Sequence, residues 1–122
     1  MTKDELASLI QASVPGRMTG NEENAILAER AARFVQTERG TLVELLRDWV
    51  SIRIPQSQRK PEDGMREGRI WLALEIMRNC GLVELYPAVD ALIADVRLGK
   101  TFLPYYADMI AKYRNPSDQG MS

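Results

Sequence analysis

In the stretch Ile70-Trp71-Leu72-Ala73-Leu74-Glu75-Ile76-Met77, apolar side chains would cover nearly every side of a helix, and Glu75 is the single carboxylate. A helix that is apolar all round is surrounded by protein, whereas a surface helix is apolar along one stripe. The stretch is far shorter than the roughly 18 residues that a membrane span needs. We therefore predict that it forms the central helix of a compact domain.

Start and stop signals divide the chain into about six helical segments. The pattern T-x-x-E, whose side chains can satisfy free amides of a first helical turn, begins at Thr2, Thr19 and Thr41. Gly81 suits a left-handed helix end, and Pro87 suits the first turn of the next helix. No stretch alternates apolar and polar residues as a strand would, so the predicted fold is all-α. The helices are expected at about 3–13, 21–39, 42–53, 65–80, 87–98 and 104–114.

The chain of 122 residues has the length of one domain. We expect a single helical domain over residues 1–114, followed by a polar, disordered tail over 115–122. Residues 55–64 contain two prolines and no apolar side chain, and they are predicted to form the main internal loop.

Composition narrows the function classes. The chain has no histidine and one cysteine, so imidazole chemistry, a thiolate zinc cluster and an internal disulfide are all excluded. A net charge of −1 gives no general attraction to nucleic acid or anionic lipid. The acidic N-terminus lacks the apolar core of a signal peptide, which predicts a cytoplasmic protein. We expect no cofactor, no metal and no membrane association.

Glu75 is the first candidate site residue. On a helical wheel it lies in line with Gly64, Gly68 and Asn79, a strip of small or polar residues. One interpretation is a general base in a partly buried site. The other is a solvent-facing strip in which Glu75 lies near Arg78 or Asn79. In a third interpretation the two glycines leave a groove where another helix approaches closely.

Two further groups of residues suggest a binding surface. Five basic residues could contact phosphates, although acidic residues lie among them and no aromatic platform for bases is present, which favours a solvated loop. The last predicted helix carries an aromatic and methionine stripe of the kind enriched at interface cores, or the same stripe serves the internal core. The basic residues are Arg53, Arg59, Lys60, Arg66 and Arg69, and the stripe is Tyr105, Tyr106, Met109 and Tyr113.

The segment Arg69–Val96 resembles one unit of a HEAT-type helical repeat. It reads R-x-W-L-A-L-E-I, then G-L-x-E-L-x-P, then V-x-x-L-I-x-D-V, which would be two helices joined by a short turn. The resemblance covers about a quarter of the chain and shows no clear second copy. It implies a helical hairpin in the C-terminal half and a binding scaffold without catalytic residues.

These observations predict a non-catalytic helical domain that acts as an adaptor in protein–protein interactions. Its partner would be another protein or a second copy, with a homodimer expected through the stripe on the last helix. Two other classes stay open: a nucleic-acid-binding regulator, which the charge pattern disfavours, and an enzyme that uses carboxylate chemistry.

Overall fold

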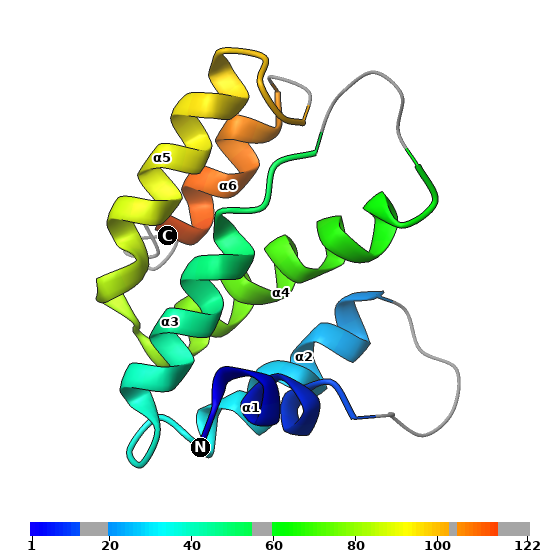
Figure 1. Cartoon of the computed structure of the whole chain (residues 1–122). Helices are drawn as coiled ribbons and strands as arrows, with labels where there is room; N and C mark the ends of the chain where they lie inside the picture. Colours follow the sequence, from blue (N-terminus) through cyan, green and yellow to red (C-terminus); the bar gives the residue numbers. More distant parts are fainter. Residues whose placement is uncertain (13–19, 55–59, 103–104, 115–122) are drawn as a thin grey trace.

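The computed structural model describes residues 1–12, 20–54, 60–102 and 105–114. Within these ranges the chain forms α-helices and one short 3₁₀ helix, with no strand, so the all-α prediction is confirmed. Figure 1 shows the helices packed around α4. Their bounds are α1 Lys3–Ile10, α2 Gly20–Ala32, α3 Arg39–Val50, α4 Asp63–Cys80, η1 Val83–Leu85, α5 Tyr86–Arg97 and α6 Tyr106–Arg114.

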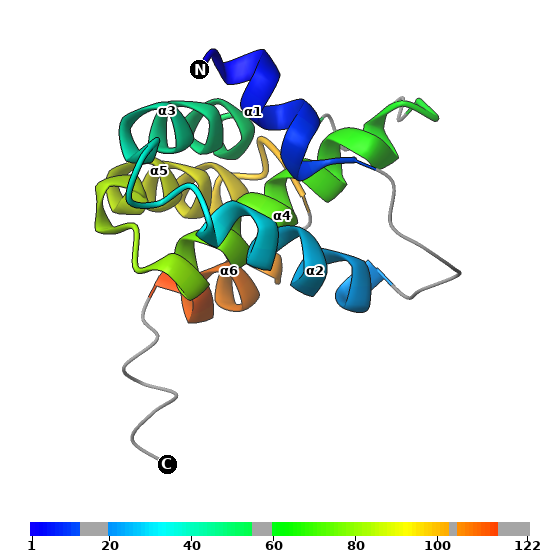
Figure 2. The ribbon, with the colours of Figure 1, turned by 90° about the horizontal axis from the view of Figure 1, so that it is seen from below.

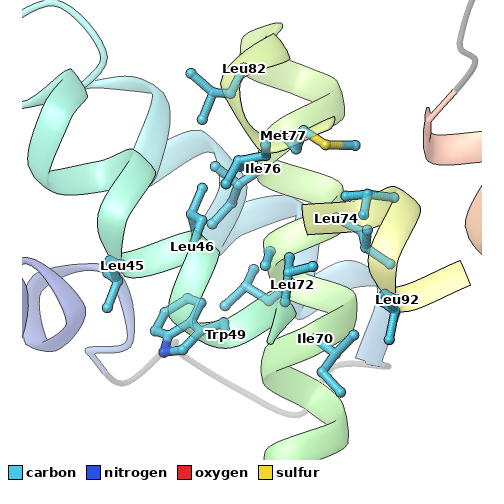
Figure 3. Packing of buried hydrophobic residues seen from close by; sticks show 14 of the residues in the cluster. Leu45, Leu46, Trp49, Ile70, Leu72, Leu74, Ile76, Met77, Leu82 and Leu92 are labelled. Carbon is cyan, nitrogen blue, oxygen red and sulfur yellow. The ribbon is translucent and has the colours of Figure 1, made fainter. Parts of the chain in front are cut away.

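Helix α4 is central, as the apolar stretch predicts. It packs against α2, α3 and α6, and six of its apolar side chains are at most 2% exposed. Figure 3 shows these side chains meeting Leu46 and Trp49 of α3 and Leu92 of α5. The residues of α4 in this core are Ile70, Leu72, Ala73, Leu74, Ile76 and Met77.

Only one of the three T-x-x-E patterns is seen to act as a capping box. Thr2 accepts a hydrogen bond from the Glu5 amide at 3.1 Å, and the Glu5 carboxylate accepts from the Thr2 amide at 3.4 Å. The prediction for Thr41 is wrong, because α3 begins two residues earlier, at Arg39, and Thr41 lies inside it. Thr19 lies outside the described residues.

Several predicted helix ends are corrected or confirmed. Helix α2 ends at Ala32, and residues 33–37 form turns, so the helix is shorter than the predicted 21–39. Helix α4 begins at Asp63 because this buried carboxylate accepts from the amide of Lys60 at 2.8 Å, which fixes the entry to the first turn. Gly81 ends α4 at φ +64° and ψ +40°, the left-handed conformation that its lack of a Cβ permits.

The C-terminal half places α5 beside α6 and α3, as Figures 1 and 2 show from two directions. Pro87 lies in the first turn of α5, as predicted. The chain between α4 and α5 contains the short helix η1, and α5 packs chiefly on α6. The likeness of Arg69–Val96 to a HEAT unit stays a prediction. No helix in the described part of the chain is long and apolar enough to cross a membrane.

Candidate functional site

A groove of about 800 Å³ lies over the face of α4 that the core does not cover. Helix α2 and the end of α1 form one wall, and α6 forms the other; Figure 1 shows α2 and α6 on opposite sides of α4. Both α2 and α6 pack against α4 itself. The groove is therefore a property of three helices from distant parts of the sequence.

The floor of the groove is one face of α4. Gly68, Trp71, Glu75 and Arg78 are three to four residues apart, which aligns their side chains along a helix. A Cβ atom built on Gly68 would meet nothing within 4 Å. The strip of small and polar residues that includes Gly68 and Glu75 thus borders open space, in agreement with the groove interpretation.

Trp71 is the centre of an aromatic cluster beside this floor. Its ring centroid lies 5.9 Å from Phe102, 6.0 Å from Tyr106 and 6.2 Å from Tyr113, all in tilted contacts typical of aromatic pairs. Tyr106 and Tyr113 are therefore partly buried against the core. Burial, together with the nearby charge of Glu75, raises the pKa of the Tyr113 phenol.

Tyr105 and Met109 are the exposed members of the predicted stripe. Their exposed fractions are 61% and 44%, and Met109 lines the groove. The rings of Tyr105 and Tyr106 stack with their centroids 4.5 Å apart. Successive side chains of a helix point about 100° apart, but α6 begins at Tyr106, so Tyr105 precedes the helix. The stripe is thus divided between internal packing and an accessible edge.

Glu75 forms an ion pair inside the groove. Nη2 of Arg78 donates to its carboxylate at 2.7 Å, and the Arg78 guanidinium lies 4.5 Å from the centroid of the Tyr113 ring. The Glu75 side chain is 19% exposed. This contact agrees with the interpretation in which Glu75 lies near Arg78. It fixes the position of both charges on the floor of the groove.

Two of the five basic candidates are used for internal contacts. Nε of Arg53 donates to Asp95 at 2.9 Å, and this guanidinium lowers the pKa of the Asp95 carboxyl. Nη1 of Arg66 donates to Asp63 at 3.0 Å, while its Nη2 donates to the Arg53 carbonyl at 3.2 Å. The contact with Asp95 ties the chain after α3 to α5, and the bond from Arg66 to the Arg53 carbonyl ties it to the start of α4.

Two of the other three basic candidates lie in the part of the chain that the structure describes. Lys60 is exposed, Arg69 lines the groove, and Arg59 lies outside the described residues. Cys80 is partly buried against the core, and burial raises the pKa of its thiol, which disfavours the reactive thiolate. Among the residues that the structure describes, no group of three or more Cys, Asp or Glu side chains could hold a metal ion.

Sequence reasoning missed the contribution of α2 to the groove. Leu27 and Asn24 line it, and so does Met65 near the start of α4. The apolar stripe of α2 indicates that Leu27 faces protein, but no local pattern says which helix α2 packs against. A signal for the groove existed only on α4, in the alignment of Gly68 with Glu75.

Comparisons of this chain with protein-family models, with curated proteins and with solved structures found no match.

Proposed function

We propose that this protein is a non-catalytic helical domain whose groove binds an amphipathic helix of a partner protein. The observation that carries the proposal is the open space above Gly68, in a groove that apolar side chains of three helices line together with polar and charged ones. Helix-in-groove recognition uses apolar side chains at one-turn spacing, and these need a trough with apolar walls and a floor that allows close approach.

The walls support this type of ligand. Leu27 lines the groove from α2, Trp71 lies on its floor, and Tyr106 and Met109 line it from α6. Met65, which is 67% exposed, also lines it. Methionine side chains are flexible and polarizable, so they adapt to the shape of an apolar ligand. The floor itself is held in place by the aromatic cluster around Trp71.

The nucleic-acid alternative finds less support in the basic residues. A phosphate-binding surface needs several cations that converge on solvent. The guanidinium groups of Arg53 and Arg66 each contact a carboxylate and a backbone carbonyl of this chain. Lys60 is exposed in the turn before α4, and Arg69 lines the groove.

The test uses a display library of helical peptides of about 16 residues, some 24 Å long at 1.5 Å per residue. Peptides selected on the wild type are titrated against two variants, Gly68→Leu and its matched control Gly64→Leu. Neither site has an atom within 4 Å of a new Cβ, but only Gly68 lines the groove. Both changes remove a helical glycine, so neither is expected to reduce folding stability.

We expect Gly68→Leu to weaken peptide binding at least about tenfold and Gly64→Leu to change it by less than about twofold. If no selected peptide responds to the two variants in this way, the proposal is wrong. Sedimentation equilibrium of the protein alone tests a different occupant. A single chain has a mass of 13.8 kDa. If the wild type has the mass of two chains and Gly68→Leu has the mass of one, the groove binds a second copy of this chain, and the proposal of a partner protein is wrong.

A further inference from the structure

Helix α5 carries a straight row of exposed apolar side chains. Pro87, Ala91, Ala94 and Leu98 follow one another at helical spacing, so they lie on one face of α5 and of the residue that ends it. All four are exposed, and Leu98, at 69%, is the most exposed of the large apolar side chains that the structure describes. Val83, just before α5, is 56% exposed. The row from Pro87 to Leu98 is called the α5 stripe below.

The α5 stripe is a different surface from the groove. No residue of α5 lines the groove, whereas three of the four residues of the predicted stripe on the last helix do. The opposite face of α5 is buried in the core through Val89, Leu92, Ile93 and Val96. Single exposed apolar residues are common on soluble proteins, but a row along one helix forms a continuous surface that a second helix can cover.

The spacing of the α5 stripe is symmetric about its middle. Pro87 and Leu98 are equally far from the middle, and so are Ala91 and Ala94. A two-fold axis through this point therefore places Ala91 opposite Ala94 of a second copy, and Pro87 opposite Leu98. The small alanines at the centre allow the two helices to approach closely, while the larger side chains meet at both ends.

The charges beside the α5 stripe have the same symmetry. Asp90 and Arg97 are two helical turns apart, so they lie on one flank of the stripe. In an antiparallel pair this flank faces itself, and Arg97 of one copy lies within about 3 Å, measured along the axis, of Asp90 of the other. The Asp90 carboxylate accepts from Arg114 through Oδ1 and is 54% exposed, so it can accept a second donor. Two symmetric ion pairs are thus available.

The other flank of the α5 stripe presents no opposing charge. Its charged residue is Asp95, whose carboxylate is already paired with Arg53 of the same chain at 2.9 Å. Pairing of two copies therefore brings no unpaired like charges together along α5.

We infer that two copies of this protein associate through α5 as an antiparallel, two-fold symmetric dimer. The occupant is a second copy because both the apolar spacing and the flanking charges are complementary to themselves, as a two-fold interface requires. Each copy contributes a short row of side chains, so the interface is small. We therefore expect a dissociation constant of about 10⁻⁵–10⁻⁴ M, and monomers at about 1 µM.

Sedimentation equilibrium at about 5–500 µM tests the association, because the fraction of dimer depends on concentration. The mass of the wild type should rise from 13.8 kDa toward that of two chains. Ala94→Glu places a carboxylate at the centre of the stripe, where pairing would bury it without a cation, and it should weaken association at least about tenfold. A wild type with the mass of one chain at every concentration, or a dimer that Ala94→Glu leaves unchanged, would overturn the inference.

Two controls show whether the effect belongs to α5. Ala25→Glu is the matched variant, because Ala25 is also an exposed alanine inside a helix and lies in α2, outside the groove lining. Gly68→Leu fills the groove. Both should associate like the wild type, and circular dichroism should show equal helix content for the two glutamate variants. Loss of the dimer in either control would place the contact outside α5 and would contradict the inference.

Disulfide formation tests the orientation without relying on Ala94→Glu. Pro87→Cys and Leu98→Cys, each in a Cys80→Ala background, are oxidised separately and as a mixture. The antiparallel register places position 87 of one copy opposite position 98 of the other. Two copies of the same position lie about 16 Å apart along the axis, too far for a disulfide. We expect disulfide-linked dimers in the mixture and none in the separate samples; the reverse pattern, or no link in the mixture, would overturn the inference.

Discussion

Arg39 and Glu84 form a two-point ion pair across 45 residues of sequence. Nε of Arg39 donates to Oε2 of Glu84 at 2.6 Å, and its Nη2 donates to Oε1 at 2.8 Å. Arg39 is the first residue of α3, and Glu84 is the central residue of η1. The pair therefore joins the start of α3 to the connection between α4 and α5.

This pair predicts a loss of stability in acid. The hydrogen bonds from Arg39 lower the pKa of Glu84 from its ordinary value of 4.5 to about 2. A depressed folded-state pKa contributes stability above pH 4.5, and that contribution disappears as the pH falls from 4.5 to about 2. Both side chains are more than a third exposed, so the effect is modest. Urea unfolding should show the stability difference between the wild type and Glu84→Gln shrinking over this interval; a constant difference would contradict the prediction.

The central position of α4 predicts a large effect of truncation. Leu74 is fully buried, and Leu74→Ala should cost about 2–5 kcal/mol of unfolding free energy, because a cavity is left in a packed core. Leu98→Ala is the control, since Leu98 is 69% exposed and its truncation should change stability by less than about 0.5 kcal/mol. Denaturant titration measures both variants. A loss below about 1 kcal/mol for Leu74→Ala would show that α4 is peripheral.

Replacement by alanine should change the folding stability in opposite directions at Gly64, inside α4, and at Gly81, at its C-terminal end. Gly81 has φ +64°, so Gly81→Ala places a Cβ in the left-handed region and should destabilise the fold by about 1 kcal/mol. Gly64 is helical with open space around it, and Gly64→Ala should stabilise by up to about 1 kcal/mol. Thermal unfolding of the two variants gives the signs directly. Equal shifts would mean that the left-handed end of α4 is not maintained.

The internal contacts of Arg53 and Arg66 predict weak binding to nucleic acid. We expect the dissociation constant for a short DNA duplex at physiological salt to be no tighter than the non-specific range of about 10⁻⁴–10⁻⁶ M. Fluorescence anisotropy measures it. Submicromolar binding that falls steeply with salt, and that is lost on reversing the charges of Arg59 and Lys60, would favour a nucleic-acid-binding regulator instead.

Local patterns were sufficient to predict the α-helices of the described residues, but not η1 or every helix end. The apolar stretch from Ile70 to Met77 predicted a helix surrounded by protein, and six of its side chains are buried, whereas Trp71 and Glu75 line the groove. The capping box at Thr2, the left-handed end at Gly81 and the first-turn Pro87 each depend on a few adjacent residues, so their backbone geometry can be read from the sequence. Thr41 shows the limit, since its pattern was present but α3 begins earlier.

What the sequence by itself determined is the helical content, the burial of α4 and the alignment of Gly68 with Glu75 on one face of that helix. Only the tertiary structure decided that α2 and α6 flank this face, that Tyr105 stacks on Tyr106, and that Arg53 reaches Asp95. Helix formation follows from interactions within a few residues, whereas a groove arises from the packing of surfaces far apart in the chain. Many amphipathic stripes could pair in principle, and the pairing that buries all of them together is a property of the whole chain.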